Sequence, residues 1–215
     1  MVLSNFNAFL APRSGGIESA IRGLVKTVLV SIASLIVLLL LPHPARGEGA
    51  WLVTLYGGQF TGSGDGDMIE LRFQDSYFTG LGLLWEFAES EPHVRWELEG
   101  QALKHFGKQD NGEFAVTINV RWLTFPWNAY LDTSLAFGSG LSYATDVPAL
   151  EARVNPDTGS TRLLHYLLVE LPFAVPGAPQ WSVATRIHHR SGMWGFFDGV
   201  GRASNFLVVG LRYRF

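Results

Sequence analysis

The sequence predicts an all-β fold: an eight-stranded antiparallel transmembrane β-barrel preceded by a signal peptide. From Trp51 onward, apolar and polar residues alternate with a period of two, whereas an amphipathic helix would repeat every 3.6 residues. Eight segments alternate in this way, an even number, as in single-chain bacterial barrels. The connections between them are alternately short and long, which is typical of barrels with short periplasmic turns and longer outer loops.

The predicted strands share one pattern, in which large apolar residues occupy one face and small or polar residues the other. They are expected at 51–61, 77–88, 94–104, 113–125, 131–143, 163–173, 180–191 and 204–215. Short turns are expected at 90–93, 126–128 and 176–179, and long loops at 62–76, 105–112, 144–162 and 192–203. The last strand ends on Phe215, which resembles the aromatic assembly signal that closes bacterial outer-membrane barrels.

Charged residues on the small-residue face argue against a soluble β-sandwich, which also alternates. A sandwich core would not bury several charges per strand unpaired, whereas the lumen of a narrow barrel is polar and crowded. The charged residues expected to point inward are Glu86, Arg95, Glu97, Glu99, Arg121, Asp132, Glu170, Arg186, Arg190, Arg212 and Arg214. Because both signs are present, we expect a paired, packed interior rather than a pore.

The N-terminal segment has the features of a secretory signal. An apolar run of 14 residues at 28–41 follows several basic residues, and Pro42 breaks any helix directly after it. This length suits the apolar region of a signal peptide and is short for a membrane span of about 20 residues. We expect residues 1–47 to be the signal peptide, with cleavage between 45 and 50, and 51–215 to be the barrel. A retained anchor is the alternative.

Composition excludes several function classes. The formal net charge of −3 does not suggest a nucleic-acid partner. The chain has no Cys, so it contains neither a disulfide framework, nor a thiolate metal site, nor a Cys nucleophile. No Gly-rich phosphate loop and no convincing metal-ligand cluster is found, so we expect an activity that needs neither cofactor nor metal.

His189 and Ser191 are the residues in the sequence that best indicate chemistry. They share the parity of Trp181, Val183 and Ile187, which should face lipid. Residues two apart on a strand point the same way, about 6–7 Å apart, so an imidazole nitrogen can reach the hydroxyl. A base beside a serine is the minimum unit of acyl-transfer chemistry. The pair lies at the outer end of its strand, where lipopolysaccharide esters are within reach.

An interfacial explanation competes with this one, because an outward His and Ser near a loop also suit lipid headgroups. Two further histidines are weaker candidates. His188 has inward parity and is expected in the lumen network with Arg186 and Arg190. His165 is expected to face outward near the end of its strand, where an interfacial role is favoured over a catalytic one.

The small barrel, the signal peptide and a penultimate strand that ends in H-x-S together resemble the PagL-type lipid A 3-O-deacylases. The resemblance covers most of the mature chain in architecture, and in motif it covers residues 184–191 and the closing strand. It implies hydrolysis of the ester-linked acyl chain at the 3-position of lipid A in the outer leaflet. By matching position, it implies that Ser191 is the nucleophile and His189 the general base.

The sequence departs from that family at two points. The family has Asn directly after the Ser and this chain has Gly192, so an oxyanion donor is expected from the backbone N–H of Gly192 or Met193. The family's acid lies near the start of the last strand, where this chain has Asn205. An Asn can orient a histidine tautomer, and Asp198 in the preceding loop is the charged alternative.

The sequence therefore supports two functions from different classes. The first is a lipid A acyl-ester hydrolase of the outer membrane, with lipopolysaccharide as its partner. The second is a small barrel without enzymatic activity that binds a partner or supports the membrane. A palmitoyl-transfer barrel is less favoured, because it needs an acyl cavity inside the barrel and the predicted lumen is charged.

Overall fold

The computed structural model describes residues 49–62, 72–90 and 93–215. The predicted signal peptide lies outside the described residues. The described strands are β1 (Trp51–Gly62), β2 (Ser76–Ser90), β3 (Val94–Gly107), β4 (Gly112–Trp122), β5 (Asp132–Thr133), β6 (Leu135–Ala144), β7 (Leu163–Ala174), β8 (Trp181–Ser191) and β9 (Arg202–Arg214). One helix, α3 (Ala149–Val154), lies between β6 and β7. No helix in the described ranges is long and apolar enough to span a membrane.

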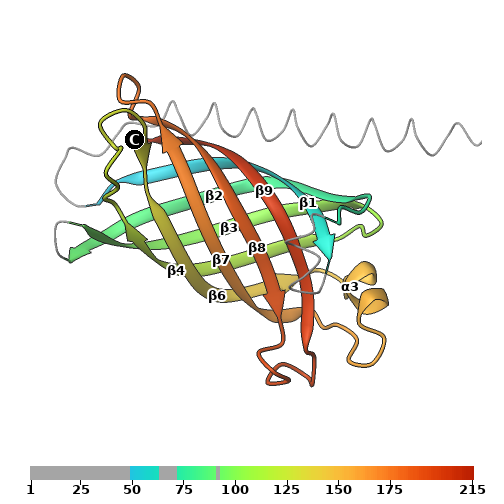
Figure 1. The fold of residues 1–215 in the computed structure, drawn as a ribbon. Coiled ribbons are helices and arrows are strands. Elements are labelled where there is room, and N and C mark those ends of the chain that lie inside the picture. Colours follow the sequence, from blue (N-terminus) through green and yellow to red (C-terminus); the bar gives the residue numbers. More distant parts are fainter. Residues whose placement is uncertain (1–48, 63–71, 91–92) are drawn as a thin grey trace, which may run out of the picture. The chain divides into compact units, whose positions relative to one another are not determined.

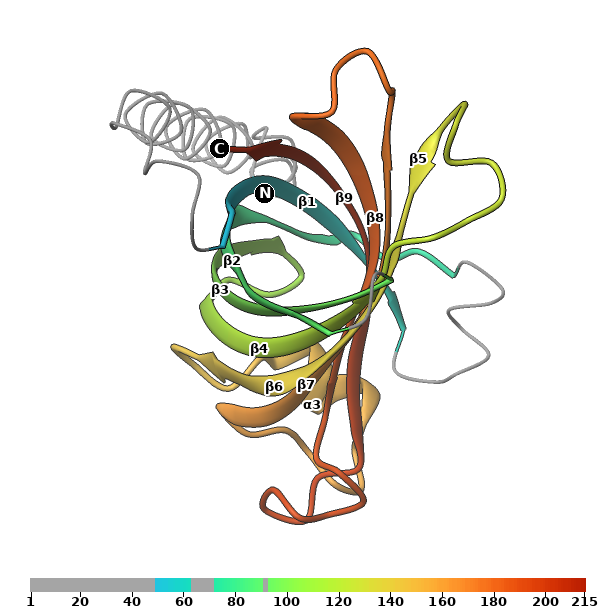
Figure 2. The same ribbon diagram turned by 90° about the vertical axis from the view of Figure 1, so that its left-hand side faces the viewer.

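The strands form one closed antiparallel barrel. Apart from the short β5, strands that follow one another along the chain pair, and β1 pairs with β9 to close the sheet (Figures 1 and 2). The two-residue β5 and the longer β6 both pair with β7, so together they form the single strand expected at 131–143, interrupted at Ser134. The barrel therefore has eight strands, and the predicted eight-stranded antiparallel barrel is confirmed.

The two faces of the sheet differ in chemistry as the alternation predicts. On β4 the apolar Phe114, Val116 and Ile118 are exposed on the outside, while Thr117 and Asn119 are buried inside. The outer apolar residues form a lipid-facing surface, because a soluble protein would not leave such residues exposed around a whole barrel. The pairing of β1 with β9 also removes the two edges that these strands would have in an open sheet.

Small residues leave room for large side chains in the lumen. Tyr56 is buried in the middle of β1, and a Cβ atom added at Gly82 or Gly210 would lie 2.7 and 2.8 Å from its ring. Real Cβ atoms almost never approach other atoms so closely, so these positions must be glycine if Tyr56 is to keep its place. Its hydroxyl donates to Glu99 at 2.7 Å.

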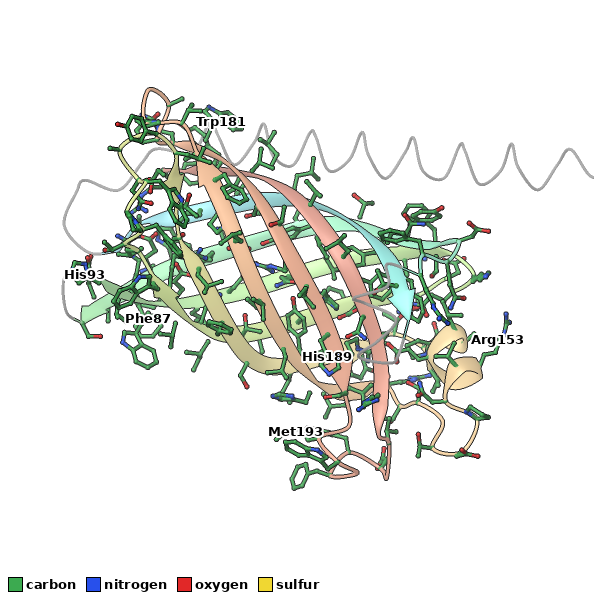
Figure 3. The ribbon with its side chains drawn as sticks, viewed as in Figure 1. Phe87, His93, Arg153, Trp181, His189 and Met193 are labelled. Atoms are coloured by element: carbon green, nitrogen blue, oxygen red, sulfur yellow. The ribbon has the colours of Figure 1, made fainter. Side chains whose placement is uncertain are left out.

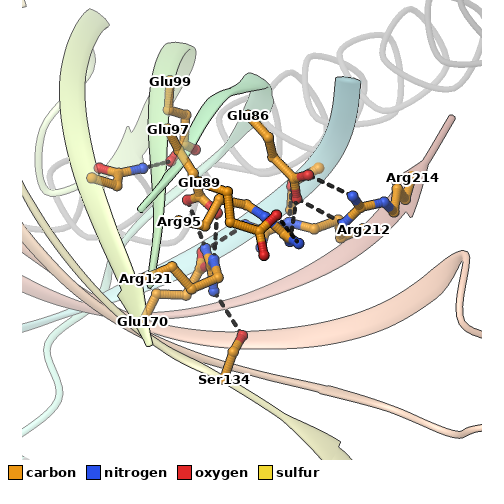
Figure 4. Close-up of polar contacts among 12 residues, drawn as sticks. Glu86, Glu89, Arg95, Glu97, Glu99, Arg121, Ser134, Glu170, Arg212 and Arg214 are labelled. Carbon is orange, nitrogen blue, oxygen red and sulfur yellow. Dashed lines mark hydrogen bonds and ion pairs between the residues drawn. The ribbon is translucent and has the colours of Figure 1, made fainter. Parts of the chain in front are cut away.

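Glu170 is the centre of an ion-pair network that links four strands through the lumen. It accepts hydrogen bonds from Arg121 at 2.8 Å, Arg186 at 2.5 Å and Arg212 at 2.7 Å. All four side chains are almost inaccessible to solvent. Further pairs extend the network, including Arg121–Glu97, Arg186–Glu99, Arg95–Glu86 and Arg214–Glu86 (Figure 4). The lumen of the described barrel is thus a packed, charge-paired core.

Three details differ from the sequence-based expectation. Asp132 lines a cavity with the inward residues Arg121 and Arg212 as expected, but it stays exposed, because it lies where the strand is interrupted. Strand β3 runs on to Gly107, so the connection to β4 is shorter than expected. The expected loop at 144–162 contains α3, whose Leu150 joins a buried apolar cluster with Phe60, Phe78, Leu103 and Phe206 among its members.

Candidate active site

Strand β8 presents its two neighbouring histidines to opposite sides of the barrel wall. His188 and Arg190 are buried in the lumen, whereas His189 and Ser191 are half-buried on the outer face. The register of β8 against β9 does shift between Arg190 and Ser191. The extra residue is Ala203 on β9, so β8 keeps its alternation and Ser191 stays on the outer side.

Asn205 on β9 lies directly opposite His189 in the register. The Nδ1 atom of His189 is 2.6 Å from the Oδ1 atom of Asn205. Because an amide oxygen only accepts hydrogen bonds, this contact places the ring proton on Nδ1. The other ring nitrogen, Nε2, then carries a lone pair, which is the form of imidazole that accepts a proton from a nucleophile.

Ser191 follows at the end of β8, two residues beyond His189 and at the same end of the strand as Met193 (Figure 3). In the part of the chain that the structure describes, no hydrogen bond joins its hydroxyl to His189. The two side chains lie on one face of β8, with Cβ atoms about 6–7 Å apart at ordinary strand spacing. Catalytic hydrogen bonds are often long before substrate binds.

A second serine–histidine pair lies on the same outer face. The Oγ atom of Ser139 on β6 is 2.9 Å from Nε2 of His165 on β7. His165 is also the register partner of Ser191. The Nδ1 atom of His165 is buried and finds no hydrogen-bond partner among the described residues, so none of them holds this nitrogen as Asn205 holds Nδ1 of His189. His165 faces outward as its sequence position predicts, and Ser139, which is not among the predicted site residues, shares the outward alternation of Phe137 and Leu141.

Asp198, the charged alternative for the third residue, lies elsewhere. It is exposed in the loop between β8 and β9 and accepts a hydrogen bond from Thr161 at 3.0 Å. No contact between Asp198 and His189 is found among the described residues. The structure thus brings Asn205 to His189 and holds Asp198 against the neighbouring loop.

The two backbone N–H groups expected as oxyanion donors, those of Gly192 and Met193, differ in their hydrogen bonding. The N–H of Gly192 donates to the carbonyl oxygen of Gly201 at 2.7 Å, so in this conformation it is not available as a donor. A Cβ atom at Gly192 would lie 1.9 Å from the carbonyl oxygen of Val200. That approach explains why this chain has Gly, and no larger residue, directly after the Ser. Met193 has a positive φ of 48°, and its N–H makes no backbone hydrogen bond within the described ranges.

A buried polar cluster underlies the site inside the barrel. Glu113 is 3.0 Å from His188 and 2.7 Å from His105. Arg190 donates to Glu151 of α3 at 2.6 Å, and Ser204 donates to the same carboxylate at 2.6 Å. These contacts fix both inward residues that flank His189 along β8.

Sequence analysis did not identify Glu113 or Glu151 as lumen residues. The inward parity of Ala115 and Thr117 would have placed Glu113, which is the first residue of that series. Glu151 lies in a loop without periodicity, so no sequence signal was available for it. No group of three or more metal-ligating side chains capable of holding an ion occurs in the described part of the chain.

Comparisons with known proteins identify the fold but no family. No protein-family model matches the sequence, and no curated protein is similar to it. The structure is similar to that of the outer-membrane enzyme PagL, with 14% identity and a TM-score of 0.50, covering 76% of this chain and 97% of that one. It also matches Neisserial surface protein A, with 12% identity, a TM-score of 0.48, and coverage of 78% and 100%. A third match is Ail, the attachment invasion locus protein of Yersinia pestis, with 12% identity, a TM-score of 0.43, and coverage of 79% and 99%.

The closed barrel, its lipid-facing exterior and its structural similarity to an outer-membrane enzyme place the chain among the small eight-stranded barrels of the bacterial outer membrane. At such low identity the similarity concerns the fold alone.

Proposed function

We propose that the protein is a lipid A acyl-ester hydrolase, which removes the ester-linked acyl chain at the 3-position of its substrate. One observation carries this proposal: the 2.6 Å contact between His189 and Asn205 on the lipid-facing side of the barrel. It leaves Nε2 of His189 basic, two residues from a serine at the outer end of the strand. A purely interfacial histidine needs no such orienting partner.

The reaction would proceed by acyl transfer to Ser191. Nε2 of His189 accepts the hydroxyl proton while Oγ attacks the carbonyl carbon of the ester. The bond to the sugar oxygen then breaks, and His189 returns the proton to that oxygen, leaving a free hydroxyl on lipid A. Water, activated by the same imidazole, hydrolyses the acyl-enzyme and releases a fatty acid.

The position of the pair indicates the substrate class. His189 and Ser191 face away from the lumen at the end of β8 that joins a long loop. In the expected orientation this end meets the outer leaflet, where lipid A presents acyl esters at the boundary between headgroup and chains. The described lumen is filled by paired charged side chains, which disfavours the palmitoyl-transfer alternative.

Stabilisation of the tetrahedral intermediate requires a hydrogen-bond donor near Ser191. The N–H of Met193 fits this role better than that of Gly192, which donates to Gly201. Movement at the start of the loop on substrate binding would be needed to release Gly192. We therefore assign the donor role to Met193.

The test is fatty-acid release from lipopolysaccharide by the purified barrel in mixed micelles. We expect Ser191→Ala and His189→Ala each to abolish release while the barrel remains folded. The matched control is Ser139→Ala, which removes a serine from the same outer face and from contact with His165. Full activity in this control, together with loss in Ser191→Ala, would support the proposal.

Two other outcomes would overturn it. Loss of activity in Ser139→Ala with retention in Ser191→Ala would make Ser139 and His165 the reactive pair. Absence of release by the wild-type protein, in the presence of folded barrel and accessible substrate, would leave the non-enzymatic function as the better account.

A further inference from the structure

The loop between β8 and β9, residues 192–201, exposes large apolar side chains directly after Ser191. Trp194 is 97% exposed and Phe196 is 81% exposed, and Met193 is partly exposed beside them. Met193 lies in the part of this loop that extends past the end of β8, beyond His189 (Figure 3). Aromatic side chains this exposed are unfavourable in water.

The loop is held in this conformation by its other side chains and its backbone. Val200 is buried with Leu164 and Ala203, and Phe197 packs against the same cluster. Within the loop, the N–H of Phe197 donates to Gly192 at 3.0 Å. The apolar residues thus divide into two that anchor the loop and three that point away from it.

Backbone conformation contributes to this arrangement. Met193 and Trp194 have φ angles of 48° and 55°, in the left-handed region that side-chain-bearing residues rarely adopt. Such conformations persist where surrounding contacts impose them. Here the hydrogen bond from Gly192 to Gly201 and the buried Val200 fix the two ends of the loop.

We propose that this loop inserts Trp194, Phe196 and Met193 into the outer leaflet of the membrane. The loop joins β8 and β9, whose outer faces carry the exposed apolar Val183, Leu207 and Val209, with the half-buried His189 and Ser191 between these residues and the loop. Tryptophan is the residue type most favoured where hydrocarbon meets headgroups. Lipid is therefore the occupant that the position and the chemistry of the loop both fit.

Insertion also bears on substrate selection, an extension that rests on the proposed hydrolase function. Because the loop begins at Gly192, the inserted side chains lie beside Ser191 along the chain. There they would contact the acyl chains of a lipid whose ester reaches the serine.

Site-directed fluorescence tests the insertion without any need for hydrolysis. The chain has no Cys, so Trp194→Cys gives a single site for an environment-sensitive label in the full barrel. The matched control is Asp157→Cys, at an exposed position in the loop between β6 and β7. Both variants are placed in phosphatidylcholine nanodiscs that contain, or lack, lipids with a nitroxide near the start of the acyl chain.

We expect the label at 194 to be quenched at least twofold more by the nitroxide lipid than the label at 157, with blue-shifted emission and weaker quenching by iodide. Equal iodide quenching at the two positions would overturn insertion and place the loop in water. Shielding of position 194 from both quenchers would also overturn it, in favour of a protein partner or a second copy of the chain. If the loop does not insert, the proposed hydrolase function is unaffected, because that function is tested separately through Ser191→Ala.

Discussion

Replacing Asn205 with alanine removes the acceptor that holds the Nδ1 proton of His189. Without it, the ring is free to adopt the other tautomer or another orientation, and we expect kcat to fall by roughly 10²- to 10⁴-fold. Asp198→Ala should retain wild-type activity, because Asp198 contacts Thr161 and not the imidazole. Steady-state kinetics on both variants decides the question, and the reverse result would assign the third residue to the loop.

At the residue scale, most of the site could be predicted from the alternation of side chains between the two faces of a strand. The positions of His188, His189 and Ser191 relative to the barrel wall follow from alternation alone, and so does the outward direction of Asn205. The hydrogen bond that occupies Gly192 could not be predicted, because it depends on how the loop folds back to Gly201. The roles of these residues stay a prediction until the variants are measured.

At the scale of the element, the outer faces of the strands should respond to charge according to depth. Val209 lies near the middle of β9, and arginine there would lie in hydrocarbon, at a cost of about 2–4 kcal/mol in the free energy of unfolding. Leu163 begins β7 at the outer end, and arginine there should cost only about 0–1 kcal/mol. Urea titration of both variants in bilayers measures the difference; equal costs would argue against a lipid-facing β9.

The strands were predictable as elements and their irregularities were not. All eight barrel strands follow from the two-residue period, with ends misplaced by a few residues. The extra residue Ala203 on β9 cannot be recognised from the two-residue alternation, because hydrogen bonding and not residue type creates the bulge. The helix α3 was missed because six residues inside a long polar loop show no helical periodicity.

At the scale of the whole molecule, the lumen network should determine stability. Glu170→Gln removes the charge shared by three buried arginines and leaves them without their common partner. We expect a loss of about 3–5 kcal/mol in the free energy of unfolding. Lys104→Gln, which breaks an exposed ion pair with Asp110, should cost at most about 1 kcal/mol.

Unfolding in urea, followed by the electrophoretic shift between folded and unfolded barrel, measures both variants. A Glu170→Gln barrel as stable as the wild type would mean that the arginines find other partners. Sequence analysis anticipated a paired interior from the mixture of charges on one face, but not which charges meet. That depends on the stagger of strands far apart in the chain, such as β4 and β7.

The most direct test of the account is mass spectrometry of lipid A from cells that produce the wild-type protein, the Ser191→Ala variant or neither. The account predicts a lipid A species that lacks one ester-linked acyl chain only in cells with the wild-type protein. Identical lipid A in all three strains, with comparable amounts of folded barrel in the outer membrane, would contradict it.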